Sequence, residues 1–295
     1  MFNSFGPGAN CTLDLCPIEW TVYQYRPNLP VSIVFMALYA IALIIHIYLG
    51  LRWRSWGFMT FMVIGCLYAI IGYGGRVILW TNPWSFAGFM IQMVCITGTP
   101  VFFTATIYVT LSRAIRFFAL EISRLPPRLF YWLFISADIL CLALQAIGGA
   151  LTSTSSGSSQ IGVDIAMAGL ILQVIILVIF CGFFVDYMIR YVKLQRSRMR
   201  SKKNTIATRQ RLFFGGLASA IILILARCAY RVDELSQGYS DSTKITDEQL
   251  FIGLEGVLIY VSVISLFIGH PGFGHLATRI LSHASSPTSP YSARP

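Results

Sequence analysis

Charged and amide side chains inside long apolar runs are the residues of this sequence best suited to chemistry. A charge in the hydrocarbon of a membrane costs at least about 2.5–3.5 kcal/mol, so such a residue rarely persists without a partner or a function. Projected onto helices, these side chains fall into two layers, with Gln173 near mid-depth. The layer nearer one membrane face holds Arg76, Gln92, Gln145, Arg227 and Glu255, rimmed by Arg231, Glu234 and Glu248, and the other holds His46 and Asp138.

Helical spacing turns several of these side chains toward one another. Asp138 and Gln145 are seven residues apart and share one helical face, while Arg227, Arg231 and Glu234 follow an i, i+4, i+7 stripe. Inward polar stripes predict either a network that fixes helix packing or a cavity that binds a ligand. The residues by themselves leave both possibilities open.

Arg227 and Glu255 are expected to form an ion pair. Arg227 lies about four residues before the end of the sixth span, and Glu255 about six residues after the start of the seventh. Because the two spans are antiparallel neighbours, the depths of these residues in the membrane differ by only about 3 Å. Pairing offsets much of the free energy that burial of either charge would cost.

Other kinds of chemistry lack the residues that they need. The sequence has no phosphate-binding loop, no GxSxG nucleophile motif and no CxxC pair or Cys/His cluster. We therefore expect no enzymatic activity, no cofactor, no metal and no ATP-driven transport by this chain alone. The net charge of +10 does not indicate nucleic-acid binding, because the basic residues lie in loops beside apolar runs and suit membrane lipids.

Membrane-spanning helices are the elements expected to position the polar residues. Of the 295 residues, 56% are apolar and only 12% charged, against roughly a quarter charged in soluble domains. Runs of about 20 apolar residues match the thickness of a hydrocarbon core. The sequence predicts an all-α fold with one domain at 31–272 between a tail at 1–30 and a disordered tail at 273–295. Its seven spans are expected at 31–50, 57–79, 86–112, 130–150, 161–188, 212–231 and 249–268.

Loop charges predict that the N-terminus lies outside the cytoplasm and the C-terminus inside. Basic residues concentrate at 113–128 and 190–211, which places those loops in the cytoplasm, whereas the sixth loop is acidic. On the outer side, the sequon at Asn10 is a candidate glycosylation site, and Cys11 is expected to form a disulfide with Cys16.

A series of short motifs runs along residues 25–272. In chain order they are Tyr25-x-Pro27, His46, Gly72-Tyr73-x-x-Arg76, Pro100 with Ala105 and Tyr108, Asp138, Gln145-x-x-Gly148-Gly149, Gly169-Leu170-x-x-Gln173, Arg227, Tyr230-Arg231-Val232-x-Glu234 with Gly238, Glu248, Glu255 and His270-Pro271-Gly272. Together they resemble the lipid-translocating exporter family of fungal seven-helix membrane proteins, named for resistance to an aminocholesterol. The chain departs from that pattern at Ala69, where the family has an acidic residue, and at Glu255, where it has Asp.

The resemblance implies a stress- or drug-resistance protein of the plasma membrane or an internal membrane, and it adds Tyr73 to the candidate binding residues. Family relatives are associated with export or flipping of sphingoid long-chain bases, and one branch with porphyrin uptake. We therefore expect a translocator whose amphiphilic cargo places a charged head among Arg76, Gln145, Arg227 and Glu255. A lipid-sensing seven-helix receptor and a porphyrin uptake protein remain alternatives.

The predicted topology is testable in intact cells. A single cysteine introduced at position 10 should react with an impermeant maleimide added outside, and cysteines within 195–209 should react only after permeabilisation. The N-terminal tail and the loop at 195–209 are both polar and expected to be accessible, so the reactivity of a cysteine there reports its side of the membrane. Cytoplasmic labelling at position 10 would overturn the assignment.

Overall fold

The computed structural model describes residues 11, 15–21, 23–118, 126–154, 160–198, 205–236 and 248–272, and all regular structure within them is helical. Seven helical segments of this part are long and apolar enough to cross a membrane. They are α1 (Leu29–Trp53), α2 (Trp56–Thr81), α3 (Phe86–Phe118), α4 (Pro127–Thr154), α5 (Gln160–Arg198), α6 (Thr205–Ser236) and a seventh span formed by α7 (Glu248–Leu250), η3 (Phe251–Val257) and α8 (Leu258–Ile268).

The all-α fold and its seven spans are thereby confirmed, but several helices are longer than the apolar runs predict. α5 continues to Arg198, ten residues beyond its expected end at 188. Lys, Arg and Gln are good helix formers, so a helix continues where its sequence leaves the apolar run. Asn10, the tail at 273–295 and residues 199–204 of the basic loop lie outside the described residues.

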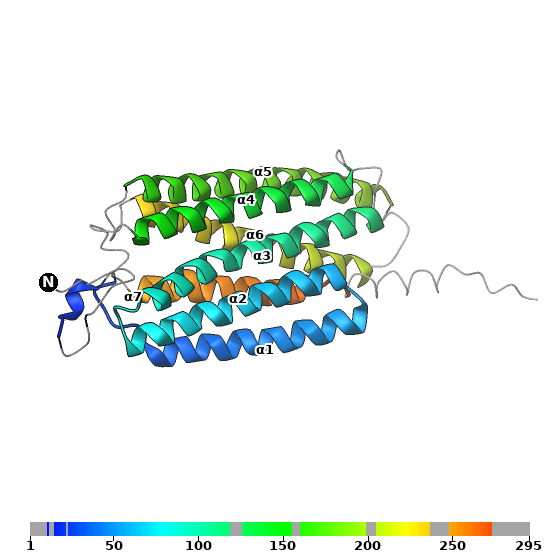
Figure 1. Ribbon diagram of the computed structural model, residues 1–295. Helices are drawn as coiled ribbons and strands as arrows, with labels where there is room; N and C mark the ends of the chain where they lie inside the picture. The colour runs from blue at the N-terminus through cyan, green and yellow to red at the C-terminus, as the bar shows by residue number, and fades with distance from the viewer. Residues whose placement is uncertain are drawn as a thin grey trace, which may run out of the picture.

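The helices run side by side along the length of the molecule, and α3 occupies the middle of the bundle (Figure 1). α3 contacts α2, α4, α6 and α8, while α1 contacts α2 and α8. Glycines permit two of the close helix contacts, because a Cβ at Gly75 would lie 2.7 Å from the backbone nitrogen of Gln92, and one at Gly148 would lie 2.4 Å from that of Ala166.

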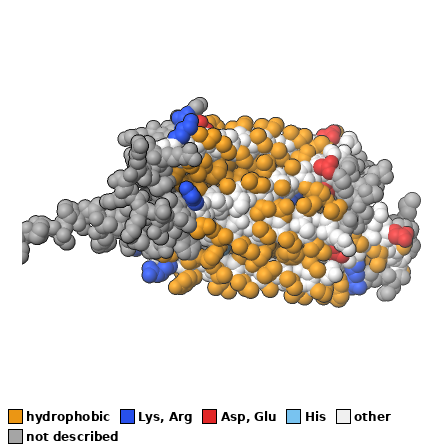
Figure 2. Space-filling view, turned by 180° about the vertical axis from the view of Figure 1, so that it is seen from behind, with side chains coloured by type: hydrophobic (Ala, Val, Ile, Leu, Met, Phe, Trp, Pro, Cys, Tyr) orange, Lys and Arg blue, Asp and Glu red, His pale blue; other side chains and the backbone are white. Residues whose placement is uncertain are grey.

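The flank of the bundle carries an apolar surface between two ends at which charged side chains gather (Figure 2). Large side chains on four helices are well exposed there, such as Ile44, Trp132, Ile161 and Ile222. Exposed apolar surface of this extent suits a lipid environment and would be a liability in water.

A short N-terminal segment covers one end of the bundle, which we call the N-terminal end. The expected disulfide between Cys11 and Cys16 is present and packs with Trp84, next to the start of α3. Arg26 donates a hydrogen bond of 2.7 Å to the carbonyl oxygen of Trp80, and its guanidinium lies over the Trp80 ring. The segment is thus fixed to the last turn of α2 and to the loop that joins α2 and α3.

Candidate functional site

Three arginines and three glutamates come together near the N-terminal end from three parts of the chain, and we call them the ionic cluster. α2 supplies one arginine, α6 two arginines and a glutamate, and the seventh span two glutamates. All are buried except Glu248, whose side chain is 25% exposed. The members are Arg76, Arg227, Arg231, Glu234, Glu248 and Glu255.

Each charge of the ionic cluster has an opposite charge beside it. Arg227 pairs with Glu255, as expected from their depths. Arg231 Nη1 lies 2.7 Å from Glu234 Oε2 and 3.7 Å from Glu255 Oε1, so Glu255 faces two cations. Arg76 Nη2 lies 3.0 Å from Glu248 Oε1. Equal numbers of cations and carboxylates keep the cluster neutral, which lowers the cost of burying it.

Glu255 lies in η3, a π-helical segment within the seventh span. Such segments are rare and often occur at functional sites, because the wider turn redirects side chains and releases backbone groups. Gly256 follows directly, and a Cβ there would lie 2.4 Å from the ring of Phe35 on α1. The glycine therefore lets α1 pack tightly against the turn that carries Glu255.

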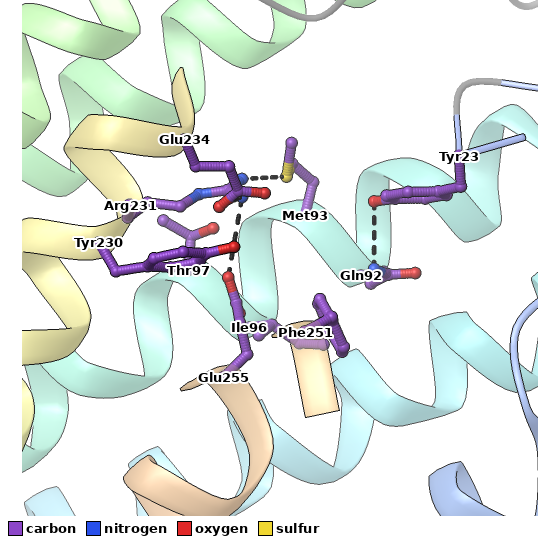
Figure 3. A pocket seen from close by; sticks show the side chains of 10 residues that line it. All are labelled: Tyr23, Gln92, Met93, Ile96, Thr97, Tyr230, Arg231, Glu234, Phe251 and Glu255. Atoms are coloured by element: carbon purple, nitrogen blue, oxygen red, sulfur yellow. Dashed lines mark hydrogen bonds and ion pairs between the residues drawn. The ribbon is translucent and has the colours of Figure 1, made fainter. Parts of the chain in front are cut away.

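A pocket opens beside the ionic cluster, and we call it the end pocket (Figure 3). Its volume is about 400 Å³ when its open side is included. Side chains of the N-terminal segment, α3, α6 and η3 line it: Tyr23, Gln92, Met93, Ile96, Thr97, Tyr230, Arg231, Glu234, Phe251 and Glu255.

Tyr23 reaches the end pocket from outside the helical bundle. Its hydroxyl accepts a hydrogen bond of 3.1 Å from Gln92 Nε2, and its ring packs on Phe89. Gln92 was a candidate from the sequence because it is an amide within an apolar run. No sequence pattern indicates a role for Tyr23. Only the folded N-terminal segment brings this residue to the site.

Several buried polar atoms around the site have no hydrogen-bond partner among the described residues. They are the Tyr73 hydroxyl, Arg76 Nη1, Gln92 Oε1 and Arg227 Nε. Buried polar groups are nearly always satisfied, so a group of exceptions in one place suggests room for a polar ligand or water. Burial raises the pKa of the nearby Tyr25 phenol, and Arg76 opposes part of that rise. Tyr25 is therefore a neutral neighbour of the cluster.

Comparison with known proteins identifies the family of this chain. The model of the RTA1 like protein family matches residues 62–277, which run from within α2 through α6 and the seventh span. The chain belongs to the RTA1-like family. No solved structure matches it.

Curated relatives of this RTA1-like chain come from Saccharomyces cerevisiae. Sphingoid long-chain base transporter RSB1 is 29% identical over 278 residues, covering 84% of this chain and 72% of the relative. Protoporphyrin uptake protein 1 is 28% identical over 207 residues, covering 70% and 66%. Protein RTM1 is 27% identical over 220 residues, covering 74% and 69%. The chain is thus an integral membrane protein similar to transporters.

Other candidate residues of this RTA1-like chain have hydrogen-bond partners outside the ionic cluster. Gln145 on α4 donates a hydrogen bond of 2.7 Å to Gln173 on α5, so these amides join two helices. Asp138 on α4 accepts hydrogen bonds from Thr104 at 3.0 Å and Tyr108 at 2.9 Å, both on α3. These hydrogen bonds join neighbouring helices and do not include Arg227 or Glu255.

His46 likewise contacts residues outside the ionic cluster. Its ring packs on Phe58 and Phe267, and Phe58 in turn contacts His270 beyond the end of α8. The described residues contain no group of three or more His, Cys, Asp or Glu side chains arranged to hold a metal ion. The ionic cluster, rather than either histidine, is the main candidate for binding a charged ligand.

A double-mutant cycle tests the central ion pair. Glu255→Gln should destabilise the protein by about 3–5 kcal/mol, because it leaves Arg227 buried beside a neutral amide. Arg227→Met should cost less, since Arg231 lies 3.7 Å from the remaining carboxylate. The double variant should be more stable than Glu255→Gln yet inactive in transport. Unfolding of the purified variants in detergent measures the first effect.

The exposed pair Arg190 and Asp186, 3.2 Å apart on α5, provides the control for that cycle. The double variant Asp186→Asn with Arg190→Met should change the free energy of unfolding by less than about 1 kcal/mol. A Glu255 and Arg227 double variant no more stable than the worse single variant would show that the two charges do not stabilise each other.

Asp138→Asn should impair function more than Asp164→Asn. Asp138 is buried and accepts hydrogen bonds from two hydroxyl groups. Asp164 is exposed, and the one hydrogen bond described for its side chain comes from Gln160. We expect a stability loss of about 1–2 kcal/mol for the first change and almost none for the second. Growth under long-chain-base stress, at matched protein levels, checks this. Equal tolerance would remove Asp138 from any functional role.

Proposed function

We propose that this protein translocates a single-chain amphiphile with a protonated amine head, a sphingoid long-chain base or a close analogue, across the membrane. The observation that carries the proposal is the end pocket, where Glu234 and Glu255 face an opening inside an otherwise apolar bundle. The similarity to a protein named as a sphingoid long-chain base transporter supports the same cargo.

An amine head suits the ionic cluster because it can replace a cation that is already there. Arg231 contacts both Glu234 and Glu255 and lines the end pocket, so it occupies the position that an ammonium group would take. A protonated amine donates three hydrogen bonds and can bind both carboxylates. If Arg231 moves aside when the amine enters, the carboxylates remain paired throughout. An exchange of this kind keeps both carboxylates from becoming bare charges in hydrocarbon.

Binding requires the end pocket to widen. As it stands, its interior would hold only about one or two water molecules. A hydrogen bond of 3.1 Å joins Tyr23 to Gln92 at one side of the pocket, and a hydrogen bond of this kind contributes only about 1 kcal/mol. We propose that the N-terminal end faces out of the cell at the plasma membrane, and that Asp138 or Glu255 couples movement to protons. Export of the amphiphile would then confer resistance to stress or drugs.

Porphyrin uptake is a second candidate. One relative is named protoporphyrin uptake protein 1, and the three arginines of the ionic cluster offer partners for porphyrin carboxylates. The amine cargo is favoured because the match to the protein named as a sphingoid long-chain base transporter covers 84% of this chain, against 70% for the match to the uptake protein.

Reconstitution of the purified protein in liposomes tests the function. The protein should accelerate flipping of a labelled long-chain base at least tenfold over empty liposomes, without ATP, and Glu255→Gln should remove most of that acceleration. Asp164→Asn is the control and should flip normally. Movement of protoporphyrin but not of the base would favour the second candidate. Movement of neither, together with ligand-dependent binding of a cytoplasmic protein, would favour a receptor.

A further inference from the structure

A second pocket lies beside the end pocket, and we call it the side pocket. It is enclosed by α3, α4, α5 and α6 and has a volume of about 480 Å³ when its open side is included. Three residues line both pockets: Met93, Thr97 and Arg231. The two pockets are therefore neighbours that share a wall.

Each helix contributes one face to the side pocket. The contributions follow helical spacing: Met90, Met93, Val94 and Thr97 from α3, Leu142, Gln145, Ala146 and Gly149 from α4, Ala166 and Leu170 from α5, and Arg231 and Leu235 from α6. On α3 and on α4 the lining spans seven residues of rise, or about 10 Å. The space is thus elongated along the helices, and all but Thr97, Gln145 and Arg231 of its lining is apolar.

Arg231 lies where the polar and the apolar pocket meet. Its Nη1 faces Glu234 and Glu255, while its Nη2 lies 2.9 Å from the sulfur of Met93, which lines both pockets. Figure 3 shows the guanidinium between these partners at the edge of the end pocket. A side chain placed in this way separates a site for charge from a site for hydrocarbon.

We infer that the side pocket binds the hydrocarbon chain of the same amphiphile whose head enters the end pocket, so that this protein selects its cargo by chain length. The inference rests on the proposed function and assigns the chain-binding part of that site. A chain that begins at the shared wall would place roughly eight methylene groups along the 10 Å of lining. Met90 and Met93 suit this role, because methionine side chains adapt to a flexible apolar ligand.

Gly149 offers a direct way to fill the side pocket. A Cβ at this position would meet no heavy atom within 4 Å, so a larger side chain can be added without a clash at that atom. Gly182 on α5 has equally open surroundings but lines neither pocket. Gly149→Leu therefore enlarges a residue of the side-pocket lining, whereas Gly182→Leu adds the same side chain away from both pockets.

Titration calorimetry in nanodiscs, with the full chain and empty nanodiscs as reference, tests the inference. The probes are sphinganine, with 18 carbons, and an eight-carbon 2-amino-1,3-diol, whose chain is too short to extend along the whole side pocket. Gly149→Leu should weaken sphinganine binding about tenfold, the equivalent of losing about two buried methylene groups. Binding of the short probe should change less than twofold, and Gly182→Leu should bind both probes as the parent protein does.

Protection of an introduced thiol gives a second measurement that does not depend on tolerance of leucine. Gly149→Cys should react with N-ethylmaleimide, and sphinganine should slow that reaction at least fivefold, as followed by mass spectrometry of the peptide that contains position 149. The short probe should protect much less.

The outcomes separate this inference from the proposed function. If the parent protein flips and binds sphinganine but Gly149→Leu leaves its affinity unchanged and position 149 is not protected, the chain lies elsewhere and the inference is wrong. Equal loss of both probes in Gly149→Leu also overturns it, because the change then acts on the head. If the parent protein neither binds nor flips sphinganine, the proposed function fails and the inference fails with it.

Discussion

The cost of burying charge in an apolar bundle governs the architecture of the N-terminal end. Six charged side chains from α2, α6 and the seventh span lie there, and each has an opposite charge beside it. Separating the helices would leave several of these charges unpaired in hydrocarbon, so the three helices must remain together. The main-chain nitrogen of Asn28 also donates to Glu248, which ties the start of α1 to the same cluster.

The same constraint explains why the proposed cargo head and the protein's own arginine are interchangeable. Glu255 already contacts Arg227 and lies near Arg231, so one cation can leave while the other stays. In a site with a single ion pair, the carboxylate would lose its only cation. The π-helical turn around Glu255 and the closely packed Gly256 hold the carboxylate between the two arginines.

Among the described residues, hydrogen bonds and close packing join the other helices. Hydroxyl groups on α3 bind Asp138, amides join α4 to α5, and glycines bring α2 close to α3 and α4 close to α5. Hydrogen bonds between membrane helices contribute roughly 1 kcal/mol each, less than the loss of a charged partner. We therefore expect α4 and α5 to shift more readily than α6 and the seventh span. Such a shift would widen the side pocket, which α4 and α5 help to line.

The amino-acid sequence by itself determined the seven spans, because the length of an apolar run and the bilayer thickness are directly related. It also determined the pairing of Arg227 with Glu255, since consecutive antiparallel spans place residues at predictable depths. Rotation and tilt of each helix are not encoded locally, so only the tertiary structure showed that Asp138 and Gln145 bind neighbouring helices and that His46 packs on aromatic rings. Tyr23 and the side pocket likewise depend on contacts between segments far apart in the chain, which no spacing along it reveals.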